Sequence, residues 1–223
     1  MQLVAQIQRM LAEIYDLDLQ HDARDFLVTR RSRLPAAARV GADGQDEELV
    51  VAQLAGELAL TLFIDARVLR RLQQHDPLHR LDAGNLSDWW TVLEGVSHFA
   101  YMIHNASHDR AVDRLELELQ AEVDKYVATA WLLLRQSPRR LPLELHPLLF
   151  ERTRIDPGRA GALYGLYAAA SDQAARFCRR VESGLARARE VAARPLAATQ
   201  MSELRRFYRL GSLRKLEHIA SYA

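Results

Sequence analysis

Two long amphipathic stretches joined by a short polar break constrain the fold of this chain more than any other feature. In each stretch, apolar side chains recur at steps of three and four residues, the period of one helix face. The first contains Trp89, Val92, Val96, Phe99, Ile103 and Ala106, and the second contains Val112, Leu115, Leu119, Val123, Tyr126, Ala130 and Leu133. We expect one helix to begin at Asn85 or Ser87 and the next at Asp109. A short polar connection favours antiparallel packing of the pair.

The stretch from Glu47 to Asp65 predicts a β-hairpin. As a helix it would be apolar on nearly every side, whereas as two strands it divides into 49–53 and 58–64 around a turn at 54–57. In the second strand, large apolar residues alternate with other side chains, which is the strand period. A third short strand at 26–29 can join the hairpin. Two strands alone are marginal in water, so we expect the sheet to pack on the helices.

The rest of the chain shows helical patterns, and prolines mark the breaks. Pro138 and Pro142 end the central helical region, because proline inside a helix removes a hydrogen bond. Pro157 suits the first turn of a further long helix. The sequence therefore predicts a mostly α (α+β) fold, a helical bundle around a long antiparallel helix pair with a small N-terminal β-hairpin or meander. We assign residues 1–84 to the N-terminal α+β part and 85–223 to the bundle, expected to form one continuous globular unit.

Composition narrows the class of protein. The 49% hydrophobic and 26% charged residues are typical of a globular rather than a disordered chain. The longest apolar run, 126–134, is far shorter than the roughly 20 residues that span a bilayer, and the first residues lack the pattern of a secretory signal. The single cysteine, Cys178, excludes an internal disulfide and a cysteine-based metal cluster. We therefore expect a cytoplasmic protein that does not enter the membrane.

Charge is divided unevenly along the chain. Residues 1–150 contain 16 Lys and Arg against 22 Asp and Glu, a net charge of −6, whereas residues 151–223 contain 14 against 7, a net charge of +7. The basic part ends with bases and aromatic residues interleaved, a pattern that can bind phosphates and stack on nucleobases. The candidate nucleic-acid or partner surface consists of Arg205, Arg206, Tyr208, Arg209, Arg214 and Lys215. An amphipathic helix with solvated arginines explains the same pattern.

Carboxylates and a histidine on the two central helices form the candidate metal site. Glu94 and His98 stand one turn apart on the first helix, and Glu118 and Glu122 stand one turn apart on the second. Helical bundles hold metal ions through such residues when the side chains converge. With Val96 at the centre of the buried stripe, however, Glu94 and His98 point away from it. We therefore favour a solvated or interhelical hydrogen-bonding cluster over a metal site.

Sequence signatures of common enzymes are absent. The chain has no glycine-rich phosphate loop, dinucleotide fingerprint, nucleophile elbow or zinc-protease helix. This favours a non-catalytic protein-interaction or regulatory protein that binds another protein or itself, as a homodimer. Two alternatives stay open: a bundle metalloprotein with the carboxylate–histidine site, and a nucleic-acid-binding protein that uses the basic C-terminal helices. The sequence identifies no catalytic residue and no cofactor, and it leaves open whether the protein is an enzyme.

Overall fold

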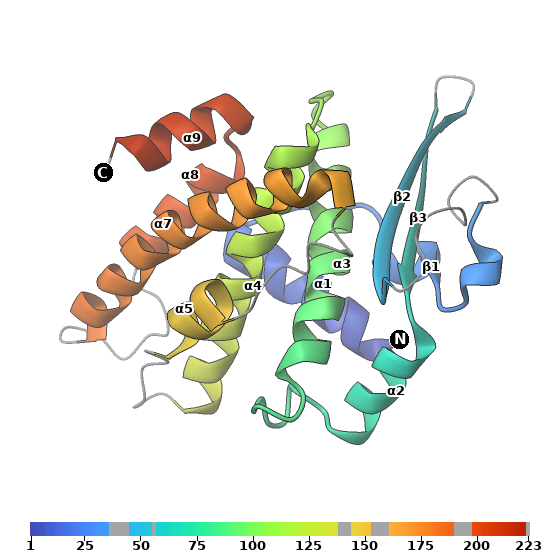
Figure 1. The fold of residues 1–223 in the computed structure, drawn as a ribbon, viewed down its shortest axis with the longest axis horizontal. Helices are drawn as coiled ribbons and strands as arrows, with labels where there is room; N and C mark the ends of the chain where they lie inside the picture. The colour runs from blue at the N-terminus through green and yellow to red at the C-terminus, as the bar shows by residue number, and fades with distance from the viewer. Residues whose placement is uncertain (36–44, 55–56, 138–143, 153–160, 190–197, 222–223) are drawn as a thin grey trace.

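A computed structural model describes residues 1–35, 45–54, 57–137, 144–152, 161–189 and 198–221 (Figure 1). Over these ranges the chain is mostly helical with a small mixed sheet, which confirms the predicted fold class. The two predicted central helices are α3 (Leu86–Ala106) and α4 (Arg114–Gln136), and they pack against each other in the middle of the molecule. Among the described residues, no helix has the combined length and apolarity that crossing a bilayer requires.

The sheet contains the predicted hairpin and the predicted third strand. Its strands are β1 (Leu27–Val28), β2 (Glu47–Leu54) and β3 (Glu57–Ile64), in the spatial order β1–β3–β2. The outer strands differ in direction, because β2 runs antiparallel to β3 and β1 runs parallel to it. Residues 55 and 56 of the predicted turn lie outside the described residues. Both long strands contact α3, so the hairpin leans on the central helix as expected.

Further helices surround the central pair. They are α1 (Gln2–Tyr15), α2 (Ala66–Gln74), α5 (Leu145–Pro147), α7 (Tyr164–Arg189), α8 (Ala198–Tyr208) and α9 (Ser212–Ala220). Short 3-10 turns lie at Ala23–Phe26, Arg31–Arg33 and Gly161–Leu163, and a π-helical turn lies at Leu148–Arg152. Helix α7 packs along α4, and α1 and α2 pack on α3 (Figure 1). Pro157, the predicted start of the long helix, lies outside the described residues.

Helix α3 is buried on more sides than its apolar stripe predicted. It contacts α1, α2 and α4 as well as β2 and β3. The stripe residues from Trp89 to Ile103 are buried as expected, whereas Ala106 is exposed. Buried residues also occur between the stripe positions, among them Leu93, Ser97 and Tyr101. A helix covered from several directions has no fully solvated face, which decides where its polar side chains lie.

The two central helices begin differently from each other. Asn85 occupies the N-cap position of α3, but its side chain accepts from the backbone of Asp82 and donates to the carbonyl oxygens of His75 and Arg80, so it fixes the preceding turn instead of capping the helix. The predicted start of α4 at Asp109 is wrong. The helix begins at Arg114, and the side chain of Asp113 accepts from the backbone N–H of Glu116 at 2.8 Å. Asp109 has a φ of 51°, a left-handed conformation outside any helix.

Candidate metal centre

Polar side chains from α3 and α4 converge inside the protein. Glu94 and His98 come from α3, Glu118 comes from α4, and each offers one ligand atom such that the three atoms lie within 4.8 Å of one another. His98 is only 5% exposed and Glu118 only 7%. The cluster on the side of α3 away from the Val96 stripe is therefore not solvated, so of the two expected readings only the interhelical hydrogen-bonding one agrees with the structure. The physical reason is that the hairpin covers the side of α3 opposite its apolar stripe.

His98 lies between two carboxylates. Its Nε2 atom is 3.5 Å from Oε2 of Glu118, and its Nδ1 atom is 3.9 Å from Oε2 of Glu47. Within the described residues, neither His98 Nε2 nor Glu47 Oε2 has a hydrogen-bond partner, although both atoms are buried. Buried polar atoms are normally hydrogen-bonded, because leaving one unpaired costs about 1–3 kcal/mol. Among the described residues, each of these two atoms therefore lacks a partner at normal hydrogen-bond length.

Glu47 reaches the cluster from the first residue of β2. Its cross-strand partner is Ile64, so it lies on the same sheet face as the Leu49–Leu62 pair, which packs on α3. A Cβ atom at Gly95 would stand 3.0 Å from Oε2 of Glu47 and 3.1 Å from Cδ1 of Leu62. Glycine inside a helix costs about 1 kcal/mol relative to alanine. At Gly95 the absence of a side chain leaves space for the Glu47 carboxylate against the helix backbone, which offsets this cost.

Lys125 of α4 forms ion pairs with two carboxylates of the cluster. Its Nζ atom lies 2.6 Å from Oε1 of Glu122 and 3.1 Å from Oε2 of Glu94. Glu122 is thus paired with the ammonium, while Glu94 is shared between the ammonium and the group of three possible ligands. Nε of Arg114 lies 3.6 Å from Oε1 of Glu118. The four candidate metal residues are therefore close together, but Glu122 is separated from His98 by the lysine contact.

The cluster, buried or partly buried throughout, has more negative charge than its fixed cations balance. Among the described residues, the carboxylates of Glu47, Glu94, Glu118 and Glu122 face two fixed cations, Lys125 and Arg114, which leaves two negative charges when His98 is neutral. Charges taken out of water must be balanced, by protons or by a cation. The surplus matches the charge of one divalent ion.

The pKa values show how protons balance this charge in the absence of a cation. Burial, together with the nearby carboxylate of Glu94, raises the pKa of Glu47 to about 8. Burial alone would lower the pKa of His98, but the carboxylates of Glu118, Glu47 and Glu94 outweigh it and raise this pKa to about 9. Burial likewise opposes the charge of Lys125, yet Glu122 and Glu94 raise its pKa above the usual value. The ammonium therefore stays charged, and Glu47 and His98 take up protons.

Searches of protein-family models, curated proteins and solved structures find no match to this chain. Its function is therefore inferred from the geometry of its side chains.

Only some residues of the predicted basic surface are exposed to solvent. Tyr208 and Lys215 are fully buried, so their assignment to an exposed surface is wrong. Arg205 donates to the carbonyl oxygens of Glu13 and Ile14, and Arg209 donates to those of Tyr15 and Asp16. Both arginines thus complete the C-terminal end of α1, where backbone carbonyls lack helical partners. Contact of the exposed Arg206 and Arg214 with nucleic acid or another protein stays a prediction.

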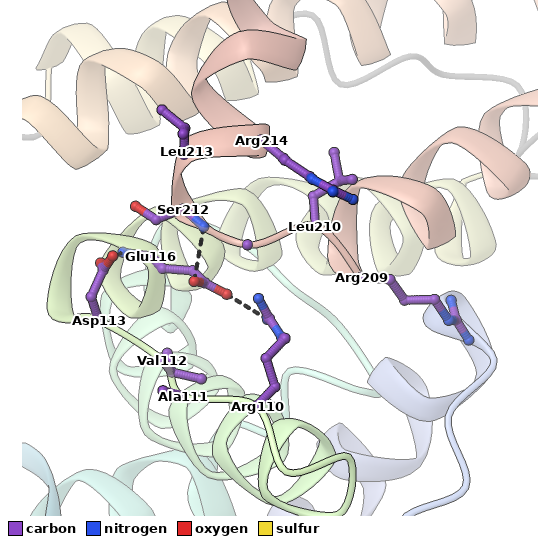
Figure 2. Close-up of a pocket in the computed structure, with 11 residues that line it drawn as sticks. Arg110, Ala111, Val112, Asp113, Glu116, Arg209, Leu210, Ser212, Leu213 and Arg214 are labelled. Atoms are coloured by element: carbon purple, nitrogen blue, oxygen red, sulfur yellow. Dashed lines mark hydrogen bonds and ion pairs between the residues drawn. The ribbon is translucent and has the colours of Figure 1, made fainter.

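A second polar group lies in an open hollow of about 670 Å³ between residues 110–113 and the turn that joins α8 to α9 (Figure 2). Figure 2 shows Glu116 pointing between Arg110 and the backbone of Ser212. The carboxylate accepts from Arg110 and Tyr101, each at 2.5 Å, and from the N–H of Ser212 at 2.9 Å. Its charge is already satisfied, so we assign Glu116 to fixing α9 on α4 and not to binding.

A third network, which the sequence did not indicate, lies in the core. Asp124 is fully buried and accepts from Tyr15 at 2.5 Å, Ser97 at 2.6 Å and Gln120 at 2.7 Å. Gln120 in turn accepts from the buried ammonium of Lys215. Burial raises the pKa of Asp124 to about 6, although its hydrogen bonds favour the charged form. Each donor is accounted for, so the network is a structural one that links α1, α3, α4 and α9.

Proposed function

We propose that this protein binds one divalent transition-metal ion through Glu94, His98 and Glu118. The observation that carries this proposal is the buried Nε2 atom of His98, which lies 3.5 Å from Oε2 of Glu118 and forms no hydrogen bond of normal length in the described structure. A neutral imidazole nitrogen is a common metal ligand. The surplus of two negative charges supports a divalent cation.

The donor set favours some metals over others. One imidazole nitrogen and carboxylate oxygens suit Zn²⁺, Mn²⁺ or Fe²⁺, whereas Mg²⁺ and Ca²⁺ prefer oxygen ligands throughout. Zinc sites with three protein ligands and one open position are typical of catalytic rather than structural zinc. An ion held by these three side chains would keep a position for water or a substrate. A metal-dependent hydrolytic activity is the reaction class that such a position supports.

Arg114 and Lys125 have supporting roles in this proposal. Arg114 lies against the far oxygen of Glu118, and Lys125 hydrogen-bonds to Glu94. Each cation contacts a ligand carboxylate and would help to hold it in place. Such partners fix the geometry of metal ligands, and their loss typically lowers metal affinity by about 10–100-fold.

The test is metal content and affinity in matched variants. Protein purified without chelator, then titrated with Zn²⁺, Mn²⁺ and Fe²⁺, is expected to bind about one equivalent of at least one metal. His98→Gln and Glu118→Gln should weaken binding by more than about 100-fold, because even the loss of a residue that only hydrogen-bonds to a ligand costs about 10–100-fold. His104→Gln is the control, since His104 lies on the same helix outside the cluster. Failure of all three metals to bind saturably, or equal loss in the control, would overturn the proposal.

The interaction and nucleic-acid functions expected from the sequence stay predictions. A partner role would require a dimer or a co-purifying protein. A nucleic-acid role would require binding that weakens steeply with salt and is lost in the double variant Arg205→Glu/Arg206→Glu. Of that pair, Arg206 is the informative position, because Arg205 already donates to the end of α1.

A further inference from the structure

We infer that Glu47 is a positioning residue for the proposed ion: its carboxylate accepts from the Nδ1–H group of His98 and so aims Nε2 at the metal. The inference rests on the metal-binding function proposed above and adds the residue that fixes its imidazole ligand. Glu47 does not bind the ion in this arrangement, so the open coordination position stays open.

The two ring nitrogens of His98 face different carboxylates. Nε2 lies 3.5 Å from Oε2 of Glu118, one of the three possible ligands, whereas Nδ1 lies 3.9 Å from Oε2 of Glu47, which is outside that group. Because the two nitrogens point to different sides of the ring, an ion beside Glu118 takes Nε2. A neutral imidazole has one N–H group, so its proton then lies on Nδ1, the side of Glu47.

The Glu47 carboxylate suits the role of acceptor for this proton. A metal-binding histidine usually donates its second N–H to a carboxylate, a backbone carbonyl or water, which fixes the tautomer and the orientation of the ring. Oε2 of Glu47 is buried and forms no hydrogen bond with any other described residue. Its distance from Nδ1 is about 1 Å longer than a normal N–H···O hydrogen bond. We expect this gap to close in the metal-bound protein, because hydrogen bonds of a site are often long until its ligand binds.

The backbone holds Glu47 in this place. It is the first residue of β2 and faces α3 at Gly95, where a Cβ atom would stand 3.0 Å from Oε2. The adjacent Glu48 lies on the opposite sheet face, since successive strand residues alternate, and it pairs with Arg31 at 3.4 Å. Two neighbouring glutamates thus have different surroundings: one has a protein cation, and the other faces the imidazole. The sheet therefore orients a ligand that belongs to the helix pair.

The proton on Nδ1 can be observed directly by NMR. In protein that carries ¹⁵N-labelled histidine and is saturated with Zn²⁺, we expect the His98 ring to bind zinc at Nε2 and to be protonated at Nδ1. The Nδ1–H group should exchange slowly with water, because it is hydrogen-bonded inside the protein. Loss of these signals in His98→Gln assigns them. Zinc on Nδ1, or a ring protonated at both nitrogens, in the zinc-saturated parent would overturn the inference.

Zinc affinity in matched variants measures the effect of the contact. Glu47→Ala removes the acceptor and should weaken Zn²⁺ binding by about 10–100-fold, whereas Glu47→Gln keeps a neutral acceptor and should recover part of this loss. Gly95→Ala should also weaken binding, because the new Cβ displaces the carboxylate. Glu48→Ala and Gly165→Ala are the controls. A Cβ at Gly165, in α7, meets nothing within 4 Å, so this variant makes the same helical substitution away from the cluster.

Exchange of the Nδ1–H group separates orientation of the ring from packing. It should become faster in zinc-saturated Glu47→Ala and stay slow in Glu47→Gln. Unchanged zinc affinity or unchanged Nδ1–H exchange in Glu47→Ala would overturn the inference and leave the three-ligand site intact. Should Glu47→Ala fail to fold, the Nδ1–H signal of the zinc-saturated parent decides alone. Absence of metal binding in the parent protein would instead overturn the proposed function itself, and this inference with it.

Discussion

The ammonium of Lys215 donates a hydrogen bond of 3.0 Å to the carbonyl oxygen of Phe207, which ties α9 to α8 from inside the protein. The ammonium also donates to the neutral side-chain oxygen of Gln120 and lies over the rings of Tyr101 and Phe207. The chain has only one other lysine, Lys125, and both are buried. They nevertheless have opposite surroundings: Lys125 contacts two carboxylates, whereas the hydrogen bonds of Lys215 go to uncharged oxygens. Burial consequently lowers the pKa of Lys215 to about 7, although Glu116 and Asp124 favour its charge.

Lys215→Met should change how stability depends on pH. Between pH 7 and 10.5, Lys215 is protonated in the unfolded chain and neutral in the folded protein. Because the unfolded state binds the extra proton, the contribution of Lys215 to the free energy of unfolding rises with pH in this window, by about 1.4 kcal/mol per unit. The parent should therefore gain stability relative to the variant between about pH 8 and pH 10. Urea unfolding at several pH values measures this difference, and parallel curves would contradict it.

Lys125→Met should destabilise the protein at neutral pH. The substitution leaves the carboxylates of Glu94 and Glu122 without their nearest cation, and removing one partner of a buried ion pair costs about 3–5 kcal/mol. Partial exposure of both carboxylates places the expected loss at the lower end, about 3 kcal/mol. Urea unfolding at pH 7 measures it. A variant as stable as the parent would show that the carboxylates are neutralised in another way.

Asp124→Ala should destabilise the core more than the loss of any one of its donors. It leaves the donors of Tyr15, Ser97 and Gln120 unpaired, and each buried unpaired group costs about 1–3 kcal/mol. We expect a loss of about 3 kcal/mol or more in the free energy of unfolding. Tyr15→Phe removes one donor and leaves the carboxylate two, so it should cost about 1–2 kcal/mol. Equal losses would show that the network is not shared among the three donors.

Zinc should stabilise the parent protein against unfolding. Free Zn²⁺ at about 100 times its dissociation constant adds about 2.7 kcal/mol to the free energy of unfolding, provided that the unfolded chain does not bind it. Chelator should reverse the gain. His98→Gln should be insensitive to both additions, whereas His104→Gln should respond like the parent. Thermal unfolding in each condition gives the comparison, and a gain retained in His98→Gln would place the ion elsewhere.

The helices and the hairpin could be predicted from the sequence, because helix and strand periods depend on residues that are close together in the chain. Apolar side chains at steps of three and four residues predicted α3 and α4, and the alternation of large apolar residues with other side chains predicted the β2–β3 hairpin. The start of α4 was misplaced because both Asp109 and Asp113 can cap a helix, and only the backbone conformation separates them. Local patterns could not have decided between the two.

The cluster was harder to predict, because its burial depends on elements distant in the sequence. The stripe through Val96 implied one buried face, but β2 and β3 cover another, and this turned Glu94 and His98 from solvated residues into interior ones. Two signals were present for Glu47: it is in phase with Leu49 along the strand, and Gly95 interrupts an apolar helix. A glycine in such a place indicates close approach of another group. Neither signal shows which residue approaches Gly95, so the contact between Gly95 and Glu47 could be found only from the three-dimensional structure.

The ends of the chain depend on each other. The ring of Tyr15 stacks on that of Tyr208 with centroids 4.3 Å apart, and Arg205 and Arg209 donate to the last carbonyls of α1. During translation, α1 leaves the ribosome long before these partners exist. At about 5–20 residues per second, the part of the α1 surface that α8 covers would wait roughly 10–40 s for its partner. That part of α1 therefore stays exposed until α8 has been synthesised, so α1 and α8 can pack together only late in the synthesis of the chain.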